Sequence, residues 1–334
     1  MRHLRLVIIS VLLVTCGGQD DRAAREADQF IAQRQYGNAR AVIEQALRAD
    51  PKNVKLLRLQ TRYFLCTEQV AFSVAAYRKL LAAQPGDRVL HRALDDPAPA
   101  VRVTAARVFG ELRGPDALAA LTKAAADREQ SVRLAVTRAL DRLDTPGAIP
   151  ILGKLLHDRD WFVRGNAALA LGKIGNADSV GALFKSLDDP DPYVRNSARL
   201  ALRRLATAAH RPAYRAALAG QSPAARVLAA LLLADADPAA VAPILIAELN
   251  RPEHPDLPEI IQTLAKIKAP GALPGLQKAA FSPDRNISVN AILALGDYRD
   301  QGSVKLLNRL RQNPQTDREV KTACLVALDR IGKK

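Results

Sequence analysis

Residues 158–175 read DRDWFVRGNAALALGKIG, and this stretch contains the pattern that decides the fold. Its Val-Arg pair occurs four times at a constant step of 31 residues, with an Asp six positions before each arginine. The two columns consist of Asp96, Asp127, Asp158 and Asp189 with Arg102, Arg133, Arg164 and Arg195. A fixed period of this length is typical of identical helical units stacked in a row, so the pattern predicts a solenoid.

One repeat is expected to contain two short helices divided by a glycine-containing turn. Apolar residues follow the Val-Arg pair at helical spacing, and the Leu-Gly-x-Ile motif that contains Gly172 is interpreted as the turn. The register continues to Arg226, slips twice by one residue and then recovers, which gives eight units of which the last is a half-unit. Because Gly220 interrupts the Asp column, and Asn290 and Lys321 interrupt the Arg column, we expect the later repeats to stack less regularly.

The pattern of Asp, five residues, Val-Arg and then Ala-Ala-x-Ala-Leu-Gly-x-Ile resembles the HEAT-like repeats of the phycobilisome-lyase type. The resemblance covers residues from about 88 to the C-terminus. It implies that the Asp and Arg columns are a structural ladder that bonds within and between repeats. Ligand binding by these columns is the alternative, and the repeat type alone does not define a function.

A second period precedes the ladder. Pro51 and Pro85 lie 34 residues apart, and each closes a segment with the pattern of helix, turn and helix. This period, with its small and aromatic residues, resembles a pair of tetratricopeptide repeats over residues 25–87. Two ordinary helical hairpins are the alternative. The expected fold is all-α: a solenoid of about eight HEAT-like helix pairs over 88–334, preceded by two tetratricopeptide-like pairs.

The N-terminus has the features of an export signal. A basic start is followed by a nine-residue apolar run, which is too short to span a bilayer as a helix. The Leu-Val-Thr-Cys sequence that ends at Cys16 resembles a bacterial lipobox. The resemblance implies a signal peptide at 1–15, a lipidated Cys16 and a short linker at 16–24. It places the chain in the periplasm on a lipid anchor, in the outer membrane in preference to the inner. An uncleaved or conventionally cleaved signal is the alternative.

Basic residues outnumber acidic ones, 49 to 34, for a net charge of +15. No Asp or Glu occurs between Asp191 and Asp235. Beyond the ladder positions, this stretch contributes Arg199, Arg203, Arg204, Arg211 and Arg215, which we interpret as a site for a protein partner with an acidic surface. A solvated basic face that binds nothing is the alternative.

The sequence offers no constellation for catalysis. Its five histidines are scattered without metal-ligand spacing, so we assign no metal site, no cofactor and no catalytic residue. Trp161, the single tryptophan, is expected to pack between repeats, and an aromatic content of 4% makes a poor platform for stacking bases.

These observations favour a non-enzymatic scaffold of the bacterial cell envelope that binds a protein partner. A bilin-lyase-like enzyme is the first alternative, because the repeat type resembles that of the lyases. A nucleic-acid-binding HEAT-like protein is the second, because the net charge is positive. The export signal argues against both, since bilin lyases and nucleic-acid-binding proteins act in the cytoplasm.

Overall fold

The computed structural model describes residues 16–175 and 177–333, and all regular secondary structure in these ranges is helical. The predicted signal peptide, 1–15, lies outside the described residues. The chain divides into two compact units, Met1–Ala170 and Leu171–Lys334, and each is described by itself. This boundary falls inside the repeat array. The predicted boundary at residues 87 and 88 separates two repeat types and stays a prediction.

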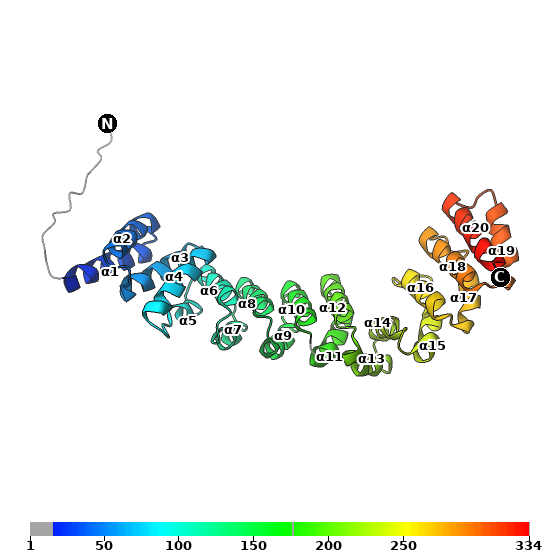
Figure 1. The fold of residues 1–334 in the computed structure, drawn as a ribbon, viewed down its shortest axis with the longest axis horizontal. Helices are drawn as coiled ribbons and strands as arrows, with labels where there is room; N and C mark the ends of the chain where they lie inside the picture. Colours follow the sequence, from blue (N-terminus) through cyan, green and yellow to red (C-terminus); the bar gives the residue numbers. More distant parts are fainter. Residues whose placement is uncertain (1–15, 176, 334) are drawn as a thin grey trace, which may run out of the picture. The chain divides into compact units, whose positions relative to one another are not determined.

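The helices of the two units are shown in Figure 1. The first unit contains α1 (Cys16–Ala32), α2 (Tyr36–Ala49), α3 (Val54–Cys66), α4 (Val70–Ala83), α5 (Val89–Ala93), α6 (Pro99–Leu112), α7 (Ala117–Ala124), α8 (Gln130–Leu143), η1 (Pro146–Ala148) and α9 (Ile149–Leu155). The boundary between the units lies within α10 (Trp161–Ile174). The second unit continues with α11 (Ala177–Lys185), η2 (Ser186–Asp188), α12 (Pro192–Arg204), η3 (Ala208–His210), α13 (Arg211–Leu218), α14 (Pro223–Leu233), α15 (Pro238–Leu249), α16 (Leu257–Ile267), η4 (Pro270–Ala272), α17 (Leu273–Ala279), α18 (Arg285–Tyr298), η5 (Gln301–Ser303), α19 (Val304–Gln312) and α20 (Arg318–Gly332).

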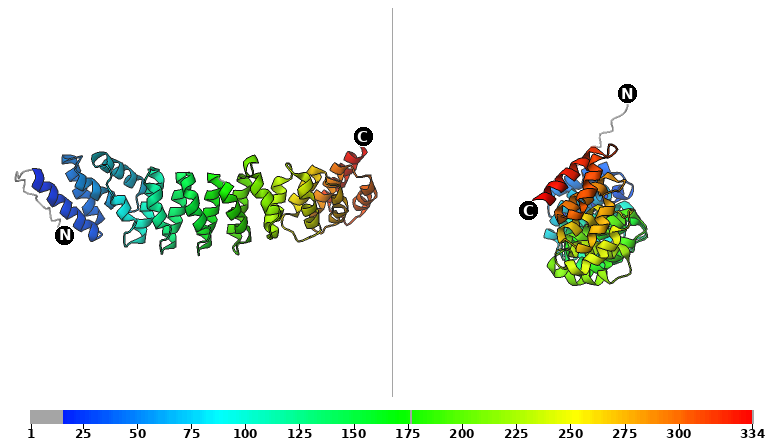
Figure 2. Two further views of the ribbon diagram at one scale, coloured as in Figure 1. Left: turned by 90° about the horizontal axis from the view of Figure 1, so that it is seen from below. Right: turned by 90° about the vertical axis from the view of Figure 1, so that its right-hand side faces the viewer.

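The 31-residue register corresponds to one helix of each repeat. These marker helices are α6, α8, α10, α12, α14, α16, α18 and α20, and a shorter or less regular helix follows each of them except the last. In the first unit, α6 and α8 form one row and α7 and α9 form the other (Figure 1). Figure 2 shows the helices of each unit standing side by side. The predicted all-α solenoid is therefore confirmed.

Two helical hairpins, α1–α2 and α3–α4, precede the marker helices. Their shared core includes Ala27, Ile31, Ile43 and Tyr63, all buried. Pro51 lies in the connection between α2 and α3, where the missing N–H of proline leaves no helical hydrogen bond unmade. The hairpins bury apolar residues from both helices of each pair, as the second period predicts.

Close stacking of the marker helices depends on small residues at the crossing points. A Cβ atom built at Gly172 would lie 2.5 Å from the Cα atom of Ala201, so no larger residue fits between α10 and α12 at this point. Gly110 stands in the same relation to Ala139, at 2.9 Å. The interpretation of Gly172 as a turn residue is wrong, because α10 continues to Ile174. The turn lies three residues later, at Gly175, whose φ of +68° is the left-handed conformation that glycine adopts without strain.

Charged residues end several marker helices in that same left-handed conformation. Arg113, Asp144, Lys268 and Arg299 follow α6, α8, α16 and α18 with φ between 49° and 54°. Glycine is the usual residue at this position because a Cβ atom is strained there. None of the helices among the described residues has the length and apolar character needed to cross a membrane.

Candidate functional site

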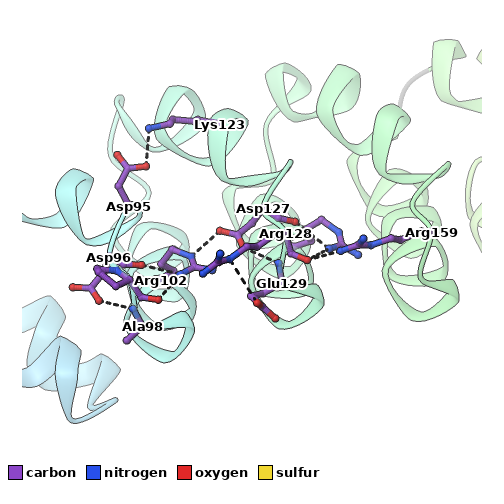
Figure 3. Close-up of polar contacts among 11 residues, drawn as sticks. Asp95, Asp96, Ala98, Arg102, Lys123, Asp127, Arg128, Glu129 and Arg159 are labelled. Carbon is purple, nitrogen blue, oxygen red and sulfur yellow. Dashed lines mark hydrogen bonds and ion pairs between the residues drawn. The ribbon is translucent and has the colours of Figure 1, made fainter.

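The aspartate and arginine columns meet in the interior of the first unit. The Arg102 guanidinium donates to both carboxylate oxygens of Asp127, from Nε at 2.7 Å and from Nη2 at 2.9 Å (Figure 3). Its Nη1 donates to the carbonyls of Asp96 and Pro97, at 2.8 and 3.2 Å, in the loop before its own helix. One arginine therefore joins its own repeat to the next one.

The same arrangement recurs one repeat later. Arg133 donates to both carboxylate oxygens of Asp158, at 2.7 and 2.8 Å, and its Nη1 bonds the carbonyls of Asp127 and Arg128. The side chains of Arg133 and Asp158 are only 6% and 7% exposed. Each ladder Asp also accepts the N–H of the residue two positions later, as in the 2.9 Å bond from Asp160 to Asp158. These contacts fill most of the hydrogen-bonding capacity of the pair.

The ladder holds its carboxylates in the charged form. Burial by itself raises the pKa of Asp127. The hydrogen bonds from Arg102 and from the backbone N–H of Glu129 outweigh that effect, so the pKa lies below its usual value. The pKa of Asp158 is lowered for the same reasons, with Arg133 and the Asp160 N–H as donors. A buried, bidentate ion pair of this kind joins repeats and presents neither charge to solvent.

The ladder changes at the fifth repeat. Arg195 bonds the carbonyls of Asp189 and Pro190, at 2.8 and 2.7 Å, as the earlier arginines do in their own loops. The carboxylate that the next repeat would contribute is absent in the sequence, because Gly220 occupies that position. In the part of the chain that the structure describes, Arg195 forms no ion pair.

The acid-free stretch of sequence does not leave its arginines unpaired. Arg199 donates twice to the carboxylate of Asp256, at 2.8 and 2.7 Å, across 57 residues of sequence. Arg203 donates to Glu259 at 2.5 Å across 56 residues, and this hydrogen bond to the carboxylate raises the pKa of the Arg203 guanidinium. These pairs join α12 directly to the start of α16, so both arginines have carboxylate partners from outside the acid-free stretch.

The ion pairs bypass one marker helix. Since α14 lies between α12 and α16 in sequence, a regular stack would place it between them in space as well. Instead α14 contacts α16 only slightly, whereas α16 packs along α18 and α18 along α20. The irregular stacking expected for the later repeats is therefore confined to the region around α14.

The remaining predicted binding residues differ in their surroundings. Arg215 pairs with Asp237 at 3.1 Å. Arg204 ends α12 and Arg211 begins α13, and both are exposed. Within residues 16–175 and 177–333, neither of these two has a carboxylate within ion-pair distance. Of the five predicted binding arginines, only Arg204 and Arg211 present a charge that the described structure does not compensate.

An aromatic pair at the start of α10 was not predicted as a surface feature. Trp161, which the sequence predicts to pack between repeats, is 45% exposed. Its ring meets that of Phe162 edge to face at 5.3 Å, and the Arg138 guanidinium lies over the Phe162 ring at 5.8 Å from its centre. The sequence signal for this cluster was the unusual Trp-Phe pair immediately before Val-Arg.

A groove of about 680 Å³ opens between α1, α3, α5 and α6. Its lining alternates in charge, and the pairs Lys55–Asp21 and Arg62–Asp28 neutralise much of it. The residues that the structure describes contain no group of histidine, cysteine, aspartate or glutamate side chains arranged to hold a metal ion. The side chain of Cys16, the predicted lipidation site, lies outside the described residues.

The helical pairs, their 31-residue register and the buried Arg–Asp ladder define an α-solenoid repeat protein. The HEAT repeat family matches residues 82–141, 124–203 and 242–329, which together exceed half of the chain. The chain therefore belongs to the HEAT repeat family. It has no match among curated proteins.

Three solved structures illustrate how far the likeness extends. The chain is 24% identical to human deoxyhypusine hydroxylase, over 73% of this chain and 95% of that one, with a TM-score of 0.34. It is 19% identical to the CpcE–CpcF complex of phycocyanin lyase from Nostoc sp. PCC7120, over 75% and 97% of the two chains, with a TM-score of 0.35. A structure of Kap95p with RanGDP is 12% identical over 86% of this chain and 44% of that one, with a TM-score of 0.50. At these identities the likeness concerns the fold alone.

Proposed function

We propose that this HEAT-repeat protein is a non-enzymatic scaffold of the bacterial cell envelope that binds a protein partner with an acidic surface. Its ladder residues support this proposal because they are occupied in holding the repeats together. What the solenoid offers to other molecules is therefore the outer surface of its helices. The structure of Kap95p with RanGDP is an example of a related fold that binds a protein.

The exposed pair Arg204 and Arg211 is the observation that carries the binding proposal. Both arginines are exposed, and neither has a carboxylate partner among the described residues. An arginine surrounded by solvent gains more from an incoming carboxylate than one already held in an internal ion pair. The partner site therefore centres on these two, and Arg199, Arg203 and Arg215 serve contacts within the chain.

The test is the double variant Arg204→Glu with Arg211→Glu, measured on a partner captured from solubilised envelopes. We expect slower association, with the largest loss at low ionic strength, because exposed charges act chiefly on the encounter rate. Lys305→Glu with Arg318→Glu is the charge-matched control, since both are exposed positions of α19 and α20. Equal weakening by both double variants would mean that net charge alone matters, and no weakening by either would refute the site.

The envelope location rests on the sequence around Cys16 and needs its own experiment. Wild-type protein is expected in the membrane fraction with a fatty-acylated Cys16, and Cys16→Ser is expected to remain at precursor size without lipid. Mass spectrometry distinguishes the two forms. Recovery of unmodified wild-type protein from the cytoplasm would refute the envelope assignment.

A further inference from the structure

The N-terminal end of α10 and the middle of α8 form an exposed cluster that the ladder does not use. Trp161 is 45% exposed, and its ring contacts Phe162. Arg138 is also exposed, and its guanidinium covers the Phe162 ring at 5.8 Å. This cation–π contact holds the arginine next to the aromatic pair without neutralising its charge.

The preceding repeat extends this cluster. Arg107 occupies on α6 the position that Arg138 occupies on α8, 31 residues later, and it is likewise exposed. Val103 and Leu134 stand four residues before these arginines, one helical turn earlier, and are half-buried. We call Val103, Arg107, Leu134, Arg138, Trp161 and Phe162 the arginine–aromatic surface.

Acidic side chains near this surface are already engaged. Glu111 forms an ion pair with Arg142 at 2.6 Å. The Asp160 carboxylate accepts the N–H groups of Phe162 and Val163, at 2.9 and 3.1 Å, and so caps the start of α10. Among the described residues, neither Arg107 nor Arg138 has a carboxylate within ion-pair distance. Two uncompensated positive charges therefore lie one helical turn from the apolar side chains of Val103 and Leu134, and one of them, Arg138, also contacts the aromatic pair.

This composition matches what protein interfaces use as anchors. Tryptophan and arginine contribute most of the energy at binding hot spots, and an adjacent apolar patch excludes water from the charge pairs. Neighbouring packed helices lie about 8–10 Å apart, so the backbone positions of Arg107 and Arg138, which are equivalent in adjacent repeats, are separated by roughly that distance. Two turns of a partner helix rise about 10 Å, which places two carboxylates opposite the two arginines.

We propose that the arginine–aromatic surface docks an acidic amphipathic helix of a partner protein. Two carboxylates, two turns apart, bind Arg107 and Arg138. An apolar side chain between them packs on Val103 and Leu134, and one beyond the Arg138 contact packs on Trp161 and Phe162. This inference goes beyond the proposed function, because it concerns residues of the first unit and not Arg204 and Arg211.

Because Trp161 is the only tryptophan, its fluorescence reports directly on this surface. The probe is a synthetic, tryptophan-free helical peptide with two glutamates two turns apart and leucines between them, added to the full chain. We expect a saturable blue shift of the Trp161 emission, and the double variant Arg107→Glu with Arg138→Glu should weaken binding by at least about tenfold. Arg204→Glu with Arg211→Glu should leave this signal unchanged.

Anisotropy of the labelled peptide provides a second readout, in which Trp161→Ala should also weaken binding. A peptide of the same composition without an amphipathic face should fail to bind. The proposal is overturned if the acidic peptide causes no shift of the Trp161 emission, or if the variants at Arg107/Arg138 and at Arg204/Arg211 lose binding equally. It is also overturned if the peptide does not bind and a single-stranded oligonucleotide binds in a way that depends on Arg107 and Arg138. Cytoplasmic recovery of the chain would refute the envelope scaffold and would not change this result.

Discussion

Truncating one ladder arginine should destabilise the stack locally. Arg133→Ala removes both hydrogen bonds to Asp158 and both to the carbonyls of Asp127 and Arg128. The Asp158 carboxylate then remains buried with the backbone N–H of Asp160 as its remaining described donor. An unpaired charge in that position is the main source of the expected cost.

The magnitude follows from the burial of the pair. Removing one partner of a buried ion pair costs about 3–5 kcal/mol. Because Arg133 and Asp158 retain 6% and 7% exposure, and the carboxylate keeps one hydrogen bond, we expect the low end, about 3 kcal/mol. In the double variant Arg133→Ala with Asp158→Ala neither charge remains buried. Its loss of stability should therefore be smaller than the sum of the losses in the two single variants, by a coupling energy of about 2 kcal/mol.

Hydrogen exchange is the suitable assay, because a solenoid couples mainly neighbouring repeats and does not unfold in one step. Amides of α8, α9 and the start of α10 should lose protection in Arg133→Ala, while those of α18 and α20 should not. Arg142→Ala is the control, since its pair with Glu111 is nearly half exposed and is expected to contribute less than about 1 kcal/mol.

The reasoning is refuted if Arg133→Ala and Arg142→Ala reduce protection equally, or if the coupling between Arg133 and Asp158 is close to zero. Either result would mean that the buried pair contributes nothing specific to the stack. The ligand-binding interpretation of the two columns would then regain support.

Four further predictions concern stability. Gly172→Ala should destabilise the second unit by about 1–3 kcal/mol in urea unfolding, because its Cβ atom would lie 2.5 Å from the backbone of Ala201. Gly181→Ala, which meets open space, should instead stabilise α11 by about 0.5–1 kcal/mol. Lys268→Gly should raise thermal stability by roughly 0.5–1 kcal/mol, because relief of left-handed strain exceeds the added chain entropy; a lower melting temperature would contradict this. The free energy of unfolding of the wild type should start to fall as the pH drops below about 4, the pKa of an aspartate in the unfolded chain, and should keep falling until the pH has passed the lowered pKa of Asp127 in the folded chain. A carboxylate whose pKa is lowered by folding contributes its full stability only above its unfolded-state pKa. Asp127→Asn should flatten that part of the pH profile, and an unchanged profile would contradict the assignment.

The fold was predictable because its information is local and repeated. Helical spacing of apolar residues predicts each helix, and the constant 31-residue step predicts that the helices stack in register. The pairing of Arg102 with Asp127 agrees with the ladder between repeats that the resemblance to HEAT-like repeats implies. Gly172 was misplaced because the sequence pattern alone does not distinguish a glycine at a helix crossing from a glycine in a turn.

The sequence by itself determined the helices, their register and the ladder columns, because each depends on neighbours within one or two repeats. The tertiary structure alone decided which charges stay free. Arg199 and Asp256 are 57 residues apart and meet because α14 leaves the regular stack; the interrupted register predicts irregular stacking there, but not which side chains it brings together. The exposure of Trp161 was likewise decided by tertiary packing, since exposure depends on how neighbouring helices cover a side chain and not on its own sequence position.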